Sequence, residues 1–207
     1  MDATGLMELI RARRSVRRYD GRPVGRDKVR LMLEALRLAP SSCNTQPWRV
    51  VAVDRPEVIG KLAECAPAGT RVNRWMATAP LVFVLCARPH TFVHKAARLA
   101  GSDCHPLDMG IAGEHLCLMA AALGLGSCWV GWFSPRPVRR LLGIPRAVEI
   151  SALIPVGYPA GGGETEPPGA GGTGPAVIGE TPAAGGAARR NPLETMAWMN
   201  RYEGDPV

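Results

Sequence analysis

The chain has 207 residues, of which 46% are hydrophobic, and its formal net charge is +7. This length and composition are those of an ordinary globular protein with one sizeable core. No apolar run reaches the roughly 18 residues that cross a bilayer, and the first residues lack the apolar segment of a signal peptide, so we expect a cytoplasmic protein.

In the first half of the chain, the spacing of apolar residues predicts two helices, over 6–14 and 27–38. The second helix is expected to end before Pro40, because the residue that precedes a proline disfavours helical dihedrals. The β-branched run 49–53 predicts a short strand, and Pro56 opens the helix that follows it.

The elements expected next are, in order, strand 80–87, helix 108–123, strand 127–132, helix 137–142 and strand 149–157. Residues 108–123 are apolar on nearly every side, which predicts a central helix wrapped by the rest of the fold. Ser134 and Pro135 are expected to be the N-cap and the first residue of the helix that leads to 142.

The C-terminal region opens with residues 160–188, of which ten of 29 are glycine and four are proline. Such a composition buries little apolar surface, so we expect a long flexible connector. After it, Asn191 as N-cap, Pro192 and Glu194 predict a helix over 191–202. This isolated helix needs a surface on which to dock, and the partner subunit of a dimer is one candidate.

Helices and strands alternate irregularly, which predicts a three-layer sandwich in which helices flank a mixed central β-sheet. We expect one domain, with residues 1–159 as its core, 160–188 as the connector, and 189–207 as a C-terminal arm that completes the same domain. The sequence contains neither the glycine-rich motif of dinucleotide-binding folds nor a P-loop motif.

The six cysteines form no CxxC pair, and their spacings fit no zinc pattern. Cys86, Cys117 and Cys128 stand in apolar runs, where thiols pack as small hydrophobic groups. We therefore expect reduced thiols. The four histidines are scattered along the chain, and we expect no metal site.

Positive charge is concentrated near the start, where residues 1–50 hold 11 Lys and Arg against 5 Asp and Glu. Arg13, Ser15 and Arg17 alternate, so in an extended stretch their side chains point the same way. Two guanidinium groups with a hydroxyl between them suit a phosphate. The alternatives are a solvated basic surface and a nucleic-acid-binding surface, although the latter lacks stacking aromatics nearby.

A second candidate segment is PSSCNTQPW, residues 40–48, between a predicted helix and a predicted strand. Ser41, Ser42, Asn44 and Gln46 offer donors and acceptors suited to the edge of a planar heterocycle. A turn that caps itself through side-chain hydrogen bonds is the alternative.

A third candidate segment is GLGSCWVGW, residues 124–132, a glycine-rich turn that runs into a strand. Gly131 could present its N–H to a ligand while Trp129 and Trp132 supply apolar walls. Tryptophans packed into the core are the alternative.

Taken together, these segments resemble the FMN-dependent nitroreductase family. The resemblance rests on RRSVRRYDGRPV, LEALRLAPSSCNTQPWRVVAV and DMGIAGEHLCLMAAALGLGSCWVGWF, followed in order by LLGIP, LIPVGYP and RRNPLE. It covers nearly the whole chain apart from the connector and residues 60–105. It implies an α+β, nitroreductase-like fold that forms an intertwined homodimer with two FMN sites at the interface.

The resemblance also implies which residues hold the cofactor. It assigns Arg13 and Ser15 to the FMN phosphate, Arg17 to the pyrimidine edge, and Arg190 to the phosphate from the C-terminal arm. Segment 41–44 is implied to come from the other subunit, and the N–H near Gly131 to face flavin N5. The full implied set is Arg13, Arg14, Ser15, Arg17, Pro40, Ser41, Ser42, Asn44, Gln46, Trp129, Val130, Gly131, Arg189 and Arg190.

The implied activity is that of an FMN-dependent NAD(P)H oxidoreductase. NADH or NADPH would give hydride to flavin N5, leave, and be replaced by a nitroaromatic, quinone or similar acceptor. The cofactor carries this chemistry, so no catalytic side chain is named. Two alternatives remain: reductive dehalogenation or flavin breakdown on the same fold, and a basic non-enzymatic protein that binds nucleic acid. We expect neither a nucleic acid nor a membrane as partner.

Overall fold

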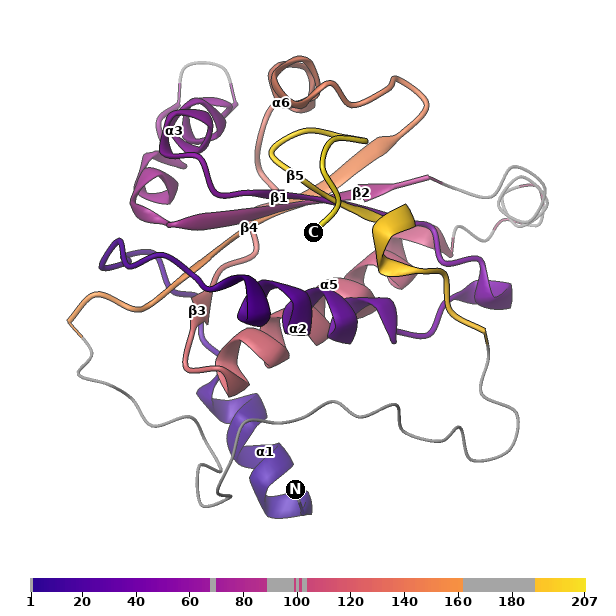
Figure 1. The fold of residues 1–207 in the computed structure, drawn as a ribbon, viewed down its shortest axis with the longest axis horizontal. Coiled ribbons are helices and arrows are strands. Elements are labelled where there is room, and N and C mark those ends of the chain that lie inside the picture. The colour runs from indigo at the N-terminus through magenta and orange to yellow at the C-terminus, as the bar shows by residue number, and fades with distance from the viewer. Residues whose placement is uncertain (1, 68–69, 89–98, 100, 102–103, 162–188) are drawn as a thin grey trace.

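The computed structural model describes residues 2–67, 70–88, 99, 101, 104–161 and 189–207 (Figure 1). The helices are α1 (Ala3–Ala12), α2 (Arg26–Arg37), α3 (Pro56–Glu64), α5 (His105–Ala122) and α6 (Pro135–Leu142). Short 3-10 helices are η1 (Ser42–Asn44), η2 (Arg74–Thr78) and η3 (Leu193–Thr195). The strands are β1 (Trp48–Val53), β2 (Leu81–Ala87), β3 (Gly126–Ser127), β4 (Glu149–Gly157) and β5 (Ala197–Met199).

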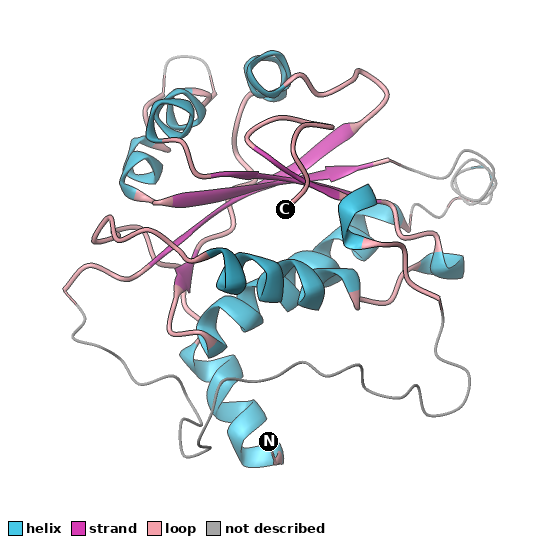
Figure 2. Cartoon of the chain, viewed as in Figure 1, coloured by secondary structure: helices cyan, strands magenta, loops and turns pink. Residues whose placement is uncertain are grey.

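The strands form a mixed sheet in the order β3-β4-β2-β1-β5. The pairs β1–β2, β2–β4 and β3–β4 are antiparallel, whereas β1 and β5 run parallel. Helices α2 and α5 cover one face of the sheet, and α3 and α6 cover the other (Figures 1 and 2). The predicted α+β sandwich of three layers around a mixed sheet is therefore confirmed.

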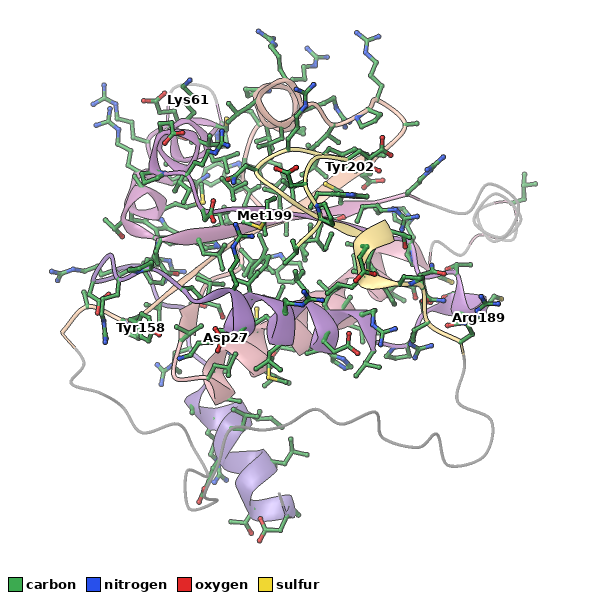
Figure 3. All side chains as sticks on the ribbon, in the orientation of Figure 1. Asp27, Lys61, Tyr158, Arg189, Met199 and Tyr202 are labelled. Atoms are coloured by element: carbon green, nitrogen blue, oxygen red, sulfur yellow. The ribbon has the colours of Figure 1, made fainter. Side chains whose placement is uncertain are left out.

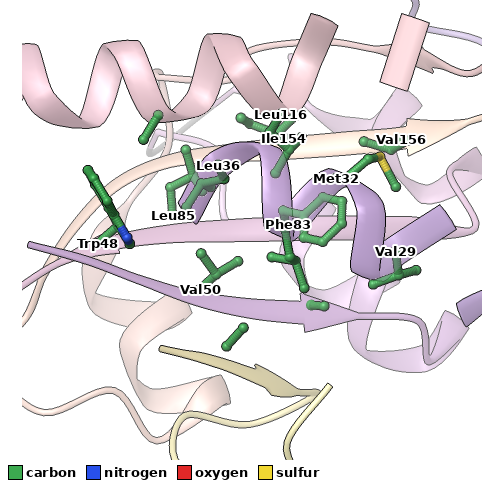
Figure 4. Packing of buried hydrophobic residues seen from close by; sticks show 14 of the residues in the cluster. Val29, Met32, Leu36, Trp48, Val50, Phe83, Leu85, Leu116, Ile154 and Val156 are labelled. Carbon is green, nitrogen blue, oxygen red and sulfur yellow. The ribbon is translucent and has the colours of Figure 1, made fainter. Parts of the chain in front are cut away.

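The sheet separates two apolar clusters. On the α2 and α5 side, Met32, Leu36, Trp48, Phe83 and Leu116 are fully buried (Figure 4). The cluster on the other side joins the opposite faces of β1, β2 and β4 to apolar residues of α3 and α6, among them Ile59, Leu62, Val138 and Leu142. Because both faces are covered, β2 is buried at every position, which explains its uninterrupted apolar sequence.

Most predicted elements are confirmed to within a few residues. Ser134 occupies the N-cap position of α6 and Pro135 its first position, as expected. The Ser134 side chain does not cap the helix, however, because its hydroxyl donates to the Ala66 carbonyl at 3.2 Å. Gly143 ends α6 in the left-handed conformation, with φ at 69°.

Helix α5 begins earlier than predicted, at His105, and it is wrapped only in part. Its buried face packs on α2 and on the sheet. The opposite face leaves Leu107 68% and Ile111 40% exposed. The expectation of a helix buried on all sides is therefore wrong for the single chain, and an apolar stripe of α5 faces solvent.

The strand predicted over 127–132 is also wrong in its extent, because β3 contains only Gly126 and Ser127. The backbone continues beside β4 as far as an isolated bridge between Val130 and Leu153. Between these pairs, Cys128 lies opposite Pro155, and the Cys128 backbone N–H donates to the Pro155 carbonyl at 3.2 Å. Pro155 has no N–H to return, so the ladder is interrupted at that point.

The C-terminal helix predicted over 191–202 does not form. In its place stand η3 and the short strand β5, whose three residues are all buried. Val50 donates to the Met196 carbonyl at 2.7 Å, and Asn200 donates to the Ala52 carbonyl at 2.8 Å, so the arm satisfies the open edge of β1. Sheet pairing outweighs the capping signal here, and the arm docks on β1 of its own chain.

The cysteines differ in their burial: Cys86 and Cys117 are buried, whereas Cys43 is exposed. Burial raises the pKa of Cys86 to about 12 and that of Cys117 to about 11, whereas the Cys43 side chain is exposed. Only the thiolate reacts with iodoacetamide, and at pH 8 both buried thiols lie well below their pKa and stay protonated.

We therefore expect iodoacetamide at pH 8 to modify Cys43 before Cys86 and Cys117, as read by peptide mass spectrometry. Raising the pH to 9 should leave Cys86 and Cys117 unmodified, and Cys43→Ser should remove the fast phase. Early modification of either buried thiol in the folded protein would contradict the packing described above.

Candidate functional site

The arginine-rich segment after α1 is held in an extended conformation against β3 and β4. Ser15 forms a parallel bridge with Ser127, and the Val16 N–H donates to the Ser127 carbonyl at 2.9 Å. The Tyr19 hydroxyl lies 2.8 Å from the Val16 carbonyl and 3.1 Å from that of Pro155. These contacts fix the backbone from which the basic side chains project.

Arg13, Ser15 and Arg17 each influence the thiol of Cys128, which follows β3. Burial raises the pKa of the Cys128 thiol, while Arg17, a hydrogen bond from Ser15, and Arg13 oppose that effect. Arg13 also forms an ion pair with Glu114 of α5 at 3.3 Å, and both side chains of this pair remain partly exposed. The cluster combines two cations and a hydroxyl beside a buried strand end.

A pocket of about 310 Å³ adjoins this segment. Arg13, Arg14 and Val16 line it on one side, and the turn 124–127 at the end of α5 lines it on the other. A Cβ on Gly126 would lie 2.6 Å from the Val16 side chain, so only glycine allows the segment to approach this closely. The third candidate segment thus begins directly beside the first.

The six-membered ring of Trp129 packs against α5 at Gly113. A Cβ on Gly113 would lie 2.1 Å from the Trp129 ring, so the glycine creates the space that the indole occupies. Val130 is buried and bridges β4, whereas Trp129 and Trp132 are 41% and 64% exposed. The two tryptophans are therefore available to a ligand rather than packed into the core.

Segment 71–78 completes this side of the site. The Asn73 side chain donates to the Trp132 carbonyl at 2.8 Å, and the Arg17 guanidinium lies 5.9 Å from the centre of the Trp75 ring. Asn73 is buried although it is polar. These contacts bring a third tryptophan to the arginine cluster, which the sequence did not indicate.

The loop between α2 and β1 is the second part of the candidate site, and its backbone is strained. Cys43, Asn44 and Gln46 have φ angles of 51°, 52° and 46°. Non-glycine residues in this region cost of order 1–3 kcal/mol each and cluster at functional sites. The Ser41 hydroxyl accepts from the Gln46 N–H at 2.9 Å, so part of the self-capping turn considered above is present.

The C-terminal arm is bound to this same loop. The Arg189 carbonyl accepts from the side chains of Asn44 and Gln46, at 2.9 and 3.1 Å. The Arg190 guanidinium donates to Asn44 Oδ1 at 2.7 Å and to the Leu38 carbonyl at 3.2 Å. In the single chain, Arg189 and Arg190 therefore lie with the second candidate segment and not with Arg13.

The Asp108 side chain of α5 holds the loop through hydrogen bonds to Ser42. Its Oδ1 accepts from the Ser42 N–H at 3.0 Å and from the Ser42 hydroxyl at 3.1 Å. Four buried side-chain atoms have no hydrogen-bond partner in the described part of the chain: Thr45 Oγ1, Trp48 Nε1, Asp108 Oδ2 and Arg190 Nε. All four belong to this loop or to residues bonded to it. Because such atoms are costly to bury, the loop has unused capacity for a ligand or a partner.

A single chain does not place its two groups of candidate residues side by side. The loop group contacts α5 at Asp108, whereas the arginine group contacts it at Glu114. Six residues of α-helix correspond to about 9 Å along the axis and about 120° around it. The two groups therefore flank different faces of α5.

The two histidines in the described part of the chain contact residues outside both groups. His105 Nε2 lies 3.1 Å from a Glu149 carboxylate oxygen, and His115 Nδ1 lies 3.2 Å from the Ala35 carbonyl. His90 and His94 lie outside the described residues, as does the connector beyond Gly161. The described residues contain no group of three or more His, Cys, Asp or Glu arranged to hold a metal ion, and none of their helices is long and apolar enough to span a membrane.

Sequence reasoning missed Asp108, Glu114 and Trp75. The sequence analysis treats Asp108 and Glu114 only as parts of an apolar helix. Asp108 could have been identified, because a single acidic residue on an otherwise apolar helix face is unusual. Trp75 lies in a region whose sequence has no hydrophobic periodicity, so no sequence pattern indicated that it belongs to the site.

The fold and the site define a class: an α+β sandwich with a mixed sheet, an extended arginine segment beside exposed tryptophans, and a strained polar loop. Residues 10–158 match the nitroreductase family. The chain therefore belongs to the nitroreductase family.

Individual relatives agree with this assignment. The chain is 34% identical over 175 residues to an NADH dehydrogenase of Thermus thermophilus, covering 72% of this chain and 83% of the relative. An FMN-dependent nitroreductase of Clostridium difficile R20291 is similar in structure, with a TM-score of 0.64, 26% identity, and coverage of 76% of this chain and 90% of that one. A nitroreductase family protein of Clostridium novyi NT, 20% identical with a TM-score of 0.76, shares the fold over 99% of this chain and 97% of its own.

Gly113 provides a test of how Trp129 is held. Gly113→Ala should push the Trp129 ring from its place, since the new Cβ overlaps it, and should quench or shift tryptophan fluorescence. Overpacking costs typically about 1–3 kcal/mol, which we expect in urea unfolding relative to a helical control.

The matched control is Gly60→Ala in α3, where a Cβ meets nothing within 4 Å. This variant should be more stable than the wild type by about 0.5–1 kcal/mol, because alanine is the better helix former. Equal stability of the two variants, with unchanged fluorescence, would show that Trp129 does not depend on Gly113.

Proposed function

We propose that the protein is an FMN-dependent oxidoreductase that takes electrons from NADH or NADPH and passes them to a nitroaromatic, quinone or similar acceptor. The observation that carries this proposal is the arginine segment held against Ser127, with Arg13 and Arg14 lining the adjoining pocket, in a chain of the nitroreductase family. When bound, FMN supplies the hydride-accepting and hydride-donating centre.

The arginine segment fits the phosphate end of this cofactor. Guanidinium groups bind phosphate by charge-assisted and bidentate hydrogen bonds, and Ser15 adds a neutral donor. Arg14 lines the adjoining pocket, and we assign it the same role in this proposal. The Gly131 N–H is proposed to donate to flavin N5, where a fixed donor stabilises developing negative charge.

The polar loop fits the other side of the cofactor. Pro40, Ser41, Ser42, Asn44 and Gln46 are proposed to contact FMN, and the unpartnered buried atoms around them support this role. In one chain the loop and the arginine segment flank different faces of α5. We therefore propose that the loop of one subunit, with Arg189 and Arg190 bound to it, faces the arginine segment of the other subunit.

A homodimer is supported by an exposed apolar surface on α1 and α5. Its exposed side chains are Leu6, Met7, Ile10, Leu107 and Ile111, each at least 40% accessible. Helix α1 projects from the body of the chain, so much of its surface is free (Figure 1). A large exposed apolar patch typically marks a protein interface, and here it adjoins both halves of the proposed cofactor site.

The acceptor is proposed to bind between the tryptophans. Trp129 and Trp132 present exposed aromatic faces beside Gly131, and Trp75 lies near Arg17. Such walls suit planar aromatic compounds and exclude water from the reacting centre. Because the donor and acceptor would use the same space in turn, steady-state kinetics should be of the ping-pong type.

The phosphate assignment is tested by Arg13→Ala. Hydrogen bonds to charged groups contribute about 1.5–3 kcal/mol, so we expect FMN to bind about 10- to 150-fold more weakly. Riboflavin, which lacks the phosphate, should bind the wild type and the variant equally. Both affinities can be measured by quenching of flavin fluorescence.

The matched control is Arg18→Ala, which removes an exposed arginine of the same segment that lies outside the proposed set. It should retain FMN on gel filtration. The phosphate assignment would be wrong if Arg13→Ala retained FMN tightly, or if its affinities for FMN and riboflavin fell equally.

The dimer is tested by placing a carboxylate on the apolar surface with Ile10→Glu or Ile111→Glu. Each change occurs twice per dimer and removes about 1.5–3 kcal/mol of apolar burial free energy per side chain. The dissociation constant of the dimer should therefore rise by at least about 100-fold. Sedimentation velocity should show monomers, and bound FMN should be lost with the dimer.

Arg136→Glu, on the exposed surface of α6, adds the same carboxylate away from α1 and α5 and should leave both properties unchanged. A monomeric variant that keeps stoichiometric FMN would show that one chain is enough to form the cofactor site.

A further inference from the structure

A second polar cavity lies on the far side of the sheet from α5. Its volume is about 510 Å³, and it opens between α3, α6 and the segment that follows β5. Figure 3 labels Lys61 on α3, and Met199 and Tyr202 at the end of β5 and after it, which mark two of the three surrounding elements. None of the residues that line this cavity belongs to the proposed cofactor site.

Three arginines line the cavity, and each comes from a different element. Arg55 is the N-cap of α3, Arg140 lies in the last turn of α6, and Arg201 follows β5. No ion pair to any of the three is found within the described ranges. Asp205 is the one acid in the lining, so the cavity has an excess of positive charge.

The walls of the cavity are fixed by specific contacts. Asn200, in the left-handed conformation with φ at 55°, accepts through Oδ1 from the N–H groups of Asp54 and Arg55, at 3.0 and 3.3 Å. Its Nδ2 donates to the Asp54 carboxylate at 2.8 Å. These bonds tie the start of α3 to the end of β5, so Arg55 is held at a defined distance from the C-terminal segment.

Arg201 is held from the other side. The Tyr202 N–H donates to the Leu142 carbonyl at 3.0 Å, which attaches the C-terminal segment to the end of α6. A Cβ on Gly143 would lie 3.2 Å from Arg201 Nε, so the guanidinium rests directly on this glycine. The position of Arg201 therefore depends on the left-handed turn that ends α6.

Apolar side chains provide the remaining surface. Val58, Leu141 and Met199 line the cavity together with the arginines. A volume of this size falls within the roughly 300–1,000 Å³ of small-molecule sites. Guanidinium groups that converge without carboxylate partners are suited to a phosphate, and the apolar side chains to the organic group attached to it.

We propose that this cavity binds a small phosphate monoester, with Arg55, Arg140 and Arg201 holding the phosphate and the apolar residues contacting the organic part. The site is separate from the proposed FMN site, because none of its lining residues belongs to the proposed FMN set. It does not depend on flavin binding, so the two assignments can fail independently.

The test is isothermal titration of flavin-loaded protein with ribose 5-phosphate, inorganic phosphate and ribose. Loading with FMN fills the proposed phosphate site at Arg13, and flavin absorbance shows whether FMN is displaced. Ribose 5-phosphate should bind one site per chain more tightly than inorganic phosphate, and ribose should not bind. The affinity for both anions should fall at least tenfold in Arg140→Ala and in Arg201→Ala.

Arg136→Ala is the matched control, since it removes an exposed arginine one turn earlier on α6, outside the cavity. It should bind as the wild type does. Arg201→Lys keeps the charge but loses the planar guanidinium group, so its affinity for both anions should lie between those of the wild type and Arg201→Ala. It replaces the alanine variant if that variant does not fold. Absence of saturable binding, equal affinity for ribose 5-phosphate and inorganic phosphate, or equal binding by the Arg136 and Arg201 variants would overturn the proposal.

Discussion

The packing of α5 against the sheet is the constraint on which the candidate site depends. Its buried face fills the core between α2 and β2, which sets the position of the whole helix. From that fixed helix, Asp108 holds the polar loop, Gly113 receives Trp129, and Glu114 pairs with Arg13. Three segments far apart in the sequence are thereby positioned by one rigid element. A binding site built on such an element is held more precisely than one built on loops alone.

The other face of α5 explains why the site looks incomplete in one chain. A helix that is apolar all round needs cover on every side, and the single chain covers α5 only in part. Among the residues that the structure describes, Thr45 Oγ1 and Trp48 Nε1 of the 41–48 loop are buried without hydrogen-bond partners. Both deficits are resolved together if a second subunit packs on α1 and α5 and brings its own half of the site. Dimerisation and cofactor binding are then one event, because neither half is satisfied alone.

The arginines of the two proposed phosphate sites come from different parts of the chain. Arg13 and Arg14 line a pocket beside the end of α5 and Arg17 lies near Trp75, whereas Arg55, Arg140 and Arg201 line a cavity between α3, α6 and the C-terminal segment. The first group is contiguous in sequence, and the second is assembled from three distant segments. Both use arginine rather than lysine at their centre, which suits planar, bidentate recognition of phosphate.

The sequence by itself determined the layers, most of the elements and the arginine segment, because apolar periodicity and side-chain alternation are local properties of the chain. It also determined the family, through motifs that stand in order. Only the tertiary structure decided that 197–199 is a strand, since the open edge of β1 offers hydrogen bonds that outweigh the capping signal at Asn191. It likewise decided that Pro155 interrupts the ladder to 128 and that Asp108 supports the loop. Each of these outcomes depends on a partner that is distant in sequence, and no local pattern records such a partner.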